Sequence, residues 1–380
     1  MKAALPIYLD YNATTPVAPE VLAVMVPYLS EHFGNPSSSH PYGIRARQAI
    51  AQAREAVAAL IGAQTDEMIF TGSATEANNL ALLGAARAAP PDKRHLIVSG
   101  IEHPAVMAPA EYLKTLGWEV TKLPVDGYGR VDPEDLRRAL RPETFFVSVM
   151  HANNEIGTIQ PIAELAALVR DHGCLMHTDA AQSAGKVAFD VNELGVDLLT
   201  IAGHKFYAPK GVGALYVRRG TPLAGILYGA EQEYGLRPGT ENVPHIVALG
   251  AAAVLAARRL AETAPHMRAL RDALHSRLAE GVPGLVLNGH PEYRLPNTLN
   301  VSFPCVTGRA LLTEAAAEVA ASVGSACHSE GEAVSGVLAA MGIDATRASG
   351  AVRLSTGWPT TTQDIERAAD TLIAAWRRLA

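Results

Sequence analysis

Short apolar runs alternate with helical patterns along the first two-thirds of the chain. Each run has four or five residues, which is too short for a typical helix and typical of a buried strand. Strands that alternate with helices predict an α/β fold with a mostly parallel sheet. We expect these strands at Met68–Thr71, His95–Val98, Phe145–Val149, Leu175–Thr178 and Leu198–Ile201.

Two helices between these strands can be placed from their apolar spacing. Apolar positions recur every three or four residues along Ile44–Leu60, and the pattern stops at Gly62. A second such pattern covers Ile162–Val169. It lies between Pro161 and Gly173, which are residue types common at the start and the end of helices. We expect both segments to be crossover helices.

The C-terminal third has a different pattern. An alanine-rich helix is expected from Val243 to about Thr263, with Pro265 marking its end. We expect a large domain at residues 16–257, and a smaller α+β domain made of residues 1–15 and 258–380.

The last segment is expected to be a docked helix. Thr361 and Asp364 have the spacing of a capping box. The apolar residues that follow lie on one face of a helix, and they are Ile365, Leu372, Ile373 and Trp376.

Composition narrows the class of protein. Hydrophobic residues make up 48% of the 380 residues and charged residues 18%, as in a folded globular protein. The net charge of −6 provides no basic field, so no direct nucleic-acid binding is expected. The longest apolar run, Ile246–Ala257, is well short of the ~20 residues that span a bilayer, and the first residues do not form the apolar core of a signal peptide. We expect no membrane span.

The three cysteines, Cys174, Cys305 and Cys327, are odd in number and show no CxxC spacing. This argues against a disulfide framework and a zinc ribbon, and it favours a reducing, cytoplasmic location without a metal site. Cys174 and Cys305 are interpreted as structural cysteines, the second in an apolar core. Cys327 lies among small residues beside His328, and both features favour a reactive thiolate.

Two polar residues follow neighbouring strands at the edge where open α/β sheets bind ligands. Lys205 comes just after a strand, where burial lowers the pKa of its amine and suits it to form a Schiff base with an aldehyde cofactor. Asp179 ends the preceding strand, where a carboxylate needs a cationic partner such as a pyridinium nitrogen. The alternatives are a surface-loop lysine and an aspartate that caps the next helix. The occurrence of both residues at consecutive strand ends favours a cofactor site.

Three further segments follow strands at the same edge. Gly72–Glu76 opens a helix, and its free backbone N–H groups and hydroxyls can hold a phosphate, although a plain capped helix has the same pattern. His103 and Asn154 follow two other strands. A lone histidine is usually structural, but an imidazole at this edge can stack on a flat cofactor and relay protons.

Further motifs occur in a fixed order along the chain: Leu9–Pro16, Gly34–Ser38, Ala74–Glu76, Glu102–His103, Asn153–Gly157, Arg237–Asn242, Gly324–Cys327 and Val352–Ser355. Together with the Asp179 and Lys205 segments, they resemble the class V aminotransferase-fold cysteine desulfurases and their relatives, the selenocysteine lyases. The resemblance extends over nearly the whole chain. It implies the PLP-dependent transferase fold of type I, with a large mostly parallel-sheet domain and a smaller α+β domain.

The resemblance implies how each matched residue binds pyridoxal 5′-phosphate (PLP). Lys205 would hold the cofactor through a Schiff base, Asp179 would pair with the pyridine nitrogen, and Gln182 would bind the ring hydroxyl. His103 would stack on the ring, with Asn154 beside it. The positions implied at the phosphate are Ala74, Thr75, Ala202, His204 and, from the neighbouring subunit of a homodimer, Thr240. The positions implied at the substrate are Arg353, which would bind its carboxylate, Asn35 and Asn154.

The reaction implied by the resemblance converts L-cysteine to L-alanine and leaves the sulfur on Cys327 as a persulfide. The freed amine of Lys205 would move the α-carbon proton, and His103 would relay protons. A separate acceptor protein would then take the sulfur.

Departures from the family pattern leave alternatives open. Ala202 stands where iron–sulfur desulfurases usually have a serine, so Thr200 or a backbone N–H is expected to replace that phosphate contact. Ser322–Gly324 and His328 are closer to the selenocysteine lyases, which is the alternative activity. The chain as a whole also resembles the bacterial desulfurase that supplies sulfur for DNA phosphorothioation. A binding scaffold without turnover is disfavoured by the near-complete set of cofactor residues, and a Cys–His hydrolase by the adjacency of its two residues.

Overall fold

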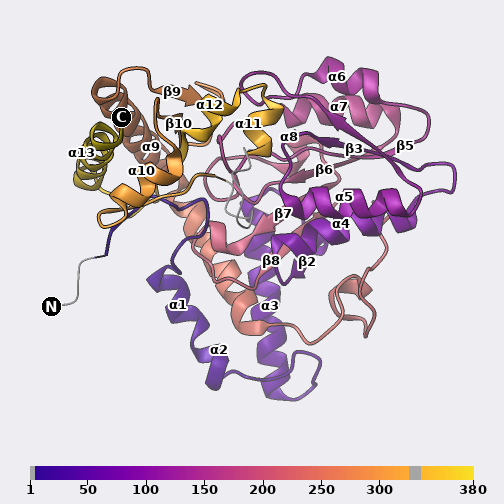
Figure 1. The fold of residues 1–380 in the computed structure, drawn as a ribbon. Helices are drawn as coiled ribbons and strands as arrows, with labels where there is room; N and C mark the ends of the chain where they lie inside the picture. Colours follow the sequence, from indigo (N-terminus) through magenta and orange to yellow (C-terminus); the bar gives the residue numbers. More distant parts are fainter. Residues whose placement is uncertain (1–4, 325–334) are drawn as a thin grey trace.

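The computed structural model describes residues 5–324 and 335–380 (Figure 1). A seven-stranded sheet is its largest sheet, in the order β2-β8-β7-β6-β5-β3-β4. The five predicted strands are confirmed to within one residue at each end, whereas β4 and β8 were not predicted. The strands are β2 (Met68–Thr71), β3 (His95–Ser99), β4 (Glu119–Leu123), β5 (Thr144–Ser148), β6 (Leu175–Asp179), β7 (Leu198–Ala202) and β8 (Gly213–Val217).

The direction of the strands determines where ligand-binding residues can meet. β4, β3, β5, β6 and β7 pair in parallel, while β8 is antiparallel to both β7 and β2. Every strand of the sheet except β8 therefore runs in the same direction. As a result, the carboxyl ends of β2, β3, β5, β6 and β7 lie at one edge of the sheet.

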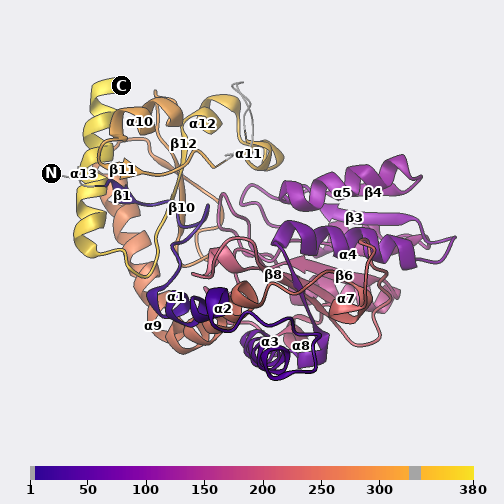
Figure 2. The same ribbon diagram turned by 90° about the horizontal axis from the view of Figure 1, so that it is seen from below.

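Helices cover both faces of this sheet (Figure 2). Successive strand residues point to opposite faces, so Leu96 and Val98 lie in the cluster under α4 and α5, while Ile97 lies in the larger cluster under α3 and α7. Both faces are buried, which explains the almost continuous apolar strands. The helices are α3 (Pro41–Leu60), α4 (Ala74–Ala88), α5 (Pro104–Thr115), α6 (Pro133–Ala139), α7 (Ile162–His172) and α8 (Val191–Leu194).

The longest helix, α9 (Val243–Gly281), corrects the sequence prediction that it would end near Thr263. Pro265 lies inside it. A proline removes one backbone hydrogen bond, but Thr263, Met267 and Leu270 are buried on either side of it, and this packing keeps the helix continuous. By length and composition alone α9 could cross a membrane, but half of its most apolar stretch is buried inside the fold, where it packs along α3.

The C-terminal part is built on a second, smaller hydrophobic cluster. It combines Leu9 with residues of α9, with the antiparallel sheet β12-β10-β9 and with the last helix. The capping box of Thr361 and Asp364 at the start of that helix is confirmed. The elements are β9 (Val286–Asn288), β10 (Thr298–Ser302), α10 (Gly308–Ala315), α11 (Gly336–Ala340), α12 (Ala345–Ser349), β12 (Ala351–Ser355) and α13 (Thr362–Leu379).

The N-terminal segment connects the two parts. β1 (Ile7–Tyr8) pairs in parallel with β11 (Val319–Ala320), and Asp10 forms a bridge to Ser355 at the end of β12. The chain then continues to α1 (Pro19–Met25) and α2 (Pro27–Ser30), which lie against α9 (Figure 2). The domain boundaries expected at residues 16 and 258 stay a prediction.

Candidate active site

The common edge of the strands collects the residues singled out from the sequence. A turn or helix start follows each strand there. These segments are Gly72–Thr75 after β2, Glu102–His103 after β3, Asn153–Asn154 after β5, Asp179–Gln182 after β6 and Gly203–Lys205 after β7. Sheet topology therefore places five predicted segments at one edge, although they are spread over more than a hundred positions of sequence.

Lys205 lies at this edge in a short 3₁₀ turn after β7, and its side chain is half-buried. Its Nζ donates to the backbone oxygens of Asn12, at 2.6 Å, and Ala13, at 2.9 Å. Asn12 is buried and was not among the predicted site residues, although it belongs to the Leu9–Pro16 motif. The N-terminal segment therefore forms a wall of the site.

Asp179 ends β6 and is 6% exposed. Its Oδ1 accepts from the backbone N–H of Ala181 at 2.8 Å, and its Oδ2 accepts from Asn78 Nδ2 at 2.7 Å. Turns rather than a helix follow Asp179, so it is not a helix cap. Asn78 was missed, and the available signal was a polar residue on the otherwise apolar buried face of α4.

His103 is the N-cap residue of α5, and its Nδ1 accepts from the backbone N–H of Ala105 at 3.1 Å. A neutral imidazole in this position carries its proton on Nε2. Burial lowers the pKa of His103, with Asp179 acting to raise it and Lys205 to lower it further. The histidine therefore favours the neutral form, in which Nε2 carries the proton.

The predicted phosphate cradle starts α4. Ser73 is its N-cap, and its Oγ accepts from the backbone N–H of Glu76 at 3.1 Å. Ala74 is the first helical residue and Thr75 is exposed beside it. Thr75 and His103 line one hollow of about 410 Å³ between α4 and α5. The structure thus brings the start of α4 and the histidine to a common opening.

Two residues near the predicted phosphate site have other partners. The Nδ1 of His204 lies 3.2 Å from Thr14 Oγ1, and burial, followed by nearby lysines, lowers the pKa of His204 to about 4. Ala202 is 1% exposed at the end of β7. The hydroxyl of Thr200, expected to replace a serine at Ala202, instead pairs with Nε2 of His177 inside the sheet at 3.1 Å. The backbone N–H groups at the start of α4 remain as the alternative.

Arg353 reaches the same edge from β12 and is 3% exposed. Its Nη2 donates to Asp10 Oδ1 at 2.7 Å and its Nη1 to the backbone oxygen of Asn154 at 3.0 Å. Its Nε is buried without a hydrogen-bond partner in the described part of the chain. The guanidinium is therefore oriented by two acceptors and keeps a donor for a further anion.

Asn35 and Thr240 lie together in a different place. Both are exposed and line a hollow of about 250 Å³ that also includes Tyr28, Phe33 and Pro36. This hollow is separate from the one lined by Thr75 and His103. The two predicted residues are thus brought together with each other rather than with the phosphate cradle of the same chain.

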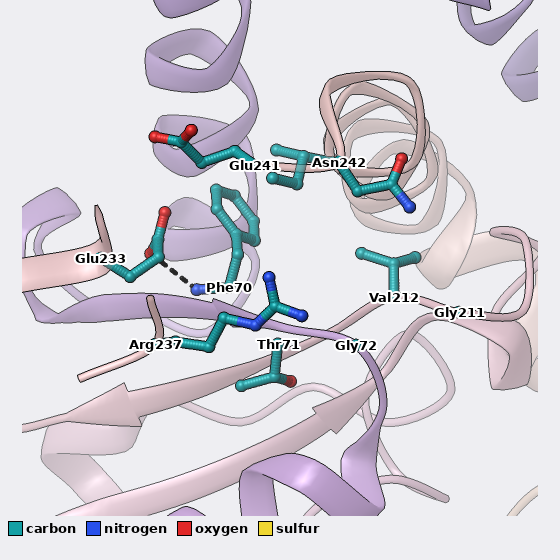
Figure 3. A pocket seen from close by; sticks show the side chains of 10 residues that line it. Phe70, Thr71, Gly72, Gly211, Val212, Glu233, Arg237, Glu241 and Asn242 are labelled. Carbon is teal, nitrogen blue, oxygen red and sulfur yellow. Dashed lines mark hydrogen bonds between the residues drawn. The ribbon is translucent and has the colours of Figure 1, made fainter. Parts of the chain in front are cut away.

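Ion pairs hold the segment before Thr240 against α3 and α4, and a hydrogen bond, drawn in Figure 3, holds it against β2. Glu233 accepts from the backbone N–H of Phe70 at 2.8 Å and from both Nη atoms of Arg54, at 2.7 and 2.6 Å. Arg237 Nε donates to Glu76 Oε1 at 2.8 Å, and Glu76 Oε2 accepts from the N–H of Gly72 at 2.9 Å. Glu76 therefore connects the phosphate cradle to the segment that carries Thr240.

The cysteines give a mixed result. Cys327, the predicted sulfur acceptor, lies outside the described residues. Cys174 is buried, and its Sγ donates to the backbone oxygen of Thr144. The prediction that Cys305 lies in an apolar core is wrong, because it is exposed in the turn after β10, with a φ of 63°. Among residues 5–324 and 335–380, no cluster of metal-ligand side chains occurs.

Comparisons with known sequences and with solved structures point to the same family. The chain matches the aminotransferase class-V family over residues 7–368. It is 46% identical over 367 residues to the cysteine desulfurase IscS of Dictyoglomus turgidum, covering 96% of this chain and 93% of that protein. Its structure is similar to that of a NifS-like protein, with a TM-score of 0.93, 38% identity and coverage of 99% and 100% of the two chains. It is also similar to SspA solved in complex with cysteine, with a TM-score of 0.82, 36% identity and coverage of 92% and 98%. The chain therefore belongs to the class-V aminotransferase family and, within it, to the cysteine desulfurases.

Proposed function

We propose that this protein is a PLP-dependent cysteine desulfurase that converts L-cysteine to L-alanine and transfers the sulfur to Cys327. The observation that carries the proposal is the placement of Lys205 and Asp179 at the ends of neighbouring strands, on one edge of the sheet. Relatives named cysteine desulfurases, and a similar structure solved in complex with cysteine, support the same substrate.

The residues present fit PLP chemically. Lys205 supplies a primary amine for the aldehyde, and Asp179 supplies a buried carboxylate for the pyridine nitrogen. The first turn of α4 supplies backbone N–H groups for the phosphate. Asn78 Oδ1 and Arg353 Nε are buried polar atoms without partners in the described residues. Burial of such atoms is costly, so a site that receives a polar ligand accounts for them.

Each side chain then has a definite task. Bound PLP supplies a sink for the electrons released at the substrate α-carbon. Lys205 Nζ takes the α-carbon proton once its amine is free, and Arg353 orients the substrate carboxylate through its guanidinium. Asn78 holds Asp179 so that its charge stays at the strand end. His103 carries a proton on Nε2 that it can donate at the mouth of the site.

The sulfur transfer balances as a nucleophilic displacement at the substrate sulfur, with the carbon as the leaving group. The thiolate of Cys327 attacks the substrate sulfur, the carbon–sulfur bond breaks, and the carbon keeps the electron pair and takes a proton to become the methyl group of alanine. The products are L-alanine and a persulfide on Cys327. A separate acceptor protein then receives the outer sulfur, and DNA phosphorothioation is one pathway that such a donor would serve.

A homodimer is part of the proposal. Large apolar side chains are exposed on α1, on α2, in the segment between α2 and α3, and at the start of α3, including Leu22, Leu29, Phe33 and Tyr42. A surface of this kind is typical of a subunit interface. Thr240 and Asn35 line the hollow beside it. Burial of this surface against a second copy would place both residues at the interface between subunits.

The proposal also includes a cytoplasmic location and one alternative substrate. The free thiols of Cys174 and Cys305 fit a reducing compartment. Selenocysteine is the alternative substrate, because Ser322–Gly324 before the reactive cysteine has the selenocysteine lyase pattern.

The proposal is tested by incubating the PLP-loaded protein with L-cysteine or L-selenocysteine and measuring alanine together with sulfide or selenide. Alanine from cysteine in several turnovers, with a reductant present, is expected. Borohydride should fix the cofactor on Lys205, as mapped by mass spectrometry, and Lys205→Ala should abolish both labelling and turnover. Labelling of another lysine, or alanine from selenocysteine alone, would contradict the proposed desulfurase.

A further inference from the structure

Lys186 is a second lysine at the site, and the reaction proposed above gives it no task. It lies in the turn after β6 and is 5% exposed. Gly185 before it has a φ of +74°, and a Cβ there would lie 2.9 Å from Cβ of Phe206. The glycine therefore lets the turn pack closely against Phe206 and bury the lysine that follows.

The Lys186 amine has two acceptors, both from site residues. Its Nζ donates to Gln182 Oε1 at 3.0 Å and lies 3.4 Å from Asn12 Oδ1. Lys186 and Lys205 also line one small cavity of about 10 Å³, close to the smallest space that holds a water molecule. Burial, followed by the charges of Lys205 and Arg353, holds the pKa of Lys186 well below its usual range, and the Lys186 charge in turn lowers the pKa of His204.

These contacts determine which end of the Gln182 amide faces Lys205. Gln182 Nε2 donates to the backbone oxygen of Asn12 at 3.0 Å, and Lys205 Nζ donates to the same oxygen at 2.6 Å. A backbone oxygen only accepts, so the NH₂ end must face it. Lys186 Nζ donates to the opposite end of the amide, its carbonyl oxygen. The NH₂ donor therefore lies beside the amine of Lys205.

We propose that Lys186 is a positioning residue that fixes the Gln182 amide, so that its NH₂ end faces whatever group Lys205 carries. The inference rests on the proposed function, because that group is PLP there. An acceptor oxygen of PLP beside its bond to Lys205 would then face the NH₂ donor of Gln182 rather than the carbonyl oxygen of that amide. Without Lys186 the carbonyl oxygen of Gln182 loses its donor, and the amide is free to turn over.

The test is a double-mutant cycle of Lys186→Met, Gln182→Leu and the double variant, with exposed Lys114→Met as the matched control. PLP affinity is measured by titration, and the absorbance of the bound cofactor is followed against pH. We expect Lys186→Met to weaken PLP binding about tenfold, the equivalent of one hydrogen bond. We also expect it to raise the pH midpoint of the absorbance by about one unit, because a donated hydrogen bond favours the deprotonated form.

The cycle separates positioning from an independent role. If Lys186 acts through Gln182, the double variant is no worse than Gln182→Leu alone, and Lys114→Met resembles the wild type. Additive effects, or a Lys186→Met protein with unchanged midpoint, would overturn the inference. If Lys186→Met does not fold, Lys186→Leu, which likewise offers no donor to Gln182 Oε1, replaces it in the cycle, and the same non-additivity is expected. A wild type that does not link PLP to Lys205 contradicts the proposed function instead.

Discussion

Asn78 and Asp179 are joined by a hydrogen bond of 2.7 Å between α4 and the end of β6. Asn78 is fully buried, and its Nδ2 is one of two donors to a carboxylate that is itself 6% exposed. The pair connects the helix that begins at the phosphate cradle to the strand that carries the carboxylate. The position of Asp179 therefore depends on a residue from a different layer of the fold.

Replacing Asn78 tests this dependence. In Asn78→Ala one oxygen of Asp179 loses its donor while the carboxylate stays buried, and we expect PLP affinity to fall about tenfold. The measurement is an absorbance titration of the apoprotein with PLP. Asn192→Ala, which removes an exposed asparagine of α8, is the control and should bind normally. Normal binding by a folded Asn78→Ala protein would show that Asp179 is held by other contacts.

Glu102 makes stability depend on pH. Burial raises the pKa of Glu102 to about 8, although hydrogen bonds from Ser99 and Met150 act in the opposite direction. The folded state thus holds a proton that the unfolded state releases near the ordinary carboxyl pKa, so the free energy of unfolding falls as pH rises through about 8.

The check compares the free energy of urea unfolding of the apoprotein at about pH 6 and at about pH 9. Ionisation of Glu102 should make this free energy lower by a few kcal/mol at the higher pH. Glu102→Gln, which cannot ionise, should show a smaller decrease over the same interval. The exposed Glu292→Gln variant should behave like the wild type. An equal decrease in all three proteins would assign the effect to other groups.

Cys327→Ser separates cofactor binding from sulfur transfer. The variant should link PLP to Lys205 and bind cysteine, but it should form no persulfide because a serine hydroxyl is not a nucleophile for sulfur at neutral pH. Labelled cysteine is added, and label on the protein is counted before and after a reductant. The exposed Cys305→Ser variant should retain normal transfer. Reductant-sensitive label on Cys327→Ser would rule out this cysteine as the acceptor.

Phe33→Asp tests the subunit interface. Phe33 is 68% exposed and lines the hollow with Thr240, so a charge there should weaken self-association at least about tenfold. Sedimentation over a range of concentrations measures the effect. Leu116→Asp, at the end of α5, adds the same charge at another exposed apolar position and should leave association unchanged. A wild type that is monomeric at all concentrations would contradict the homodimer.

The sequence predicted the parts of the site that depend on local pattern. Lys205, Asp179 and His103 each follow a short apolar run, and a mostly parallel sheet brings such positions to one edge. The contacts that hold them could not be read in this way. Asn78 and Asp179 are 101 positions apart, and Lys205 is 193 positions from Asn12. Such pairs depend on how layers pack, which no local pattern encodes.

Local rules also failed where packing opposed them. Pro265 should end a helix, yet burial on both sides keeps α9 intact. Cys305 follows an apolar strand, yet the chain turns outward at Pro304 and exposes the thiol. β8 was missed because only a 3₁₀ turn, and no α-helix, separates this short antiparallel strand from β7. In each case the outcome was set by tertiary contacts rather than by residue preference.

The uninterrupted α9 has a consequence for how the protein comes apart. Its first half contributes Ile246 and Leu249 to the larger hydrophobic cluster, and its second half contributes Leu270 and Leu274 to the smaller one. Melting of this helix would open both clusters to water at once. We therefore expect heat or denaturant to unfold the two halves of the molecule in one cooperative transition, rather than as two independent domains.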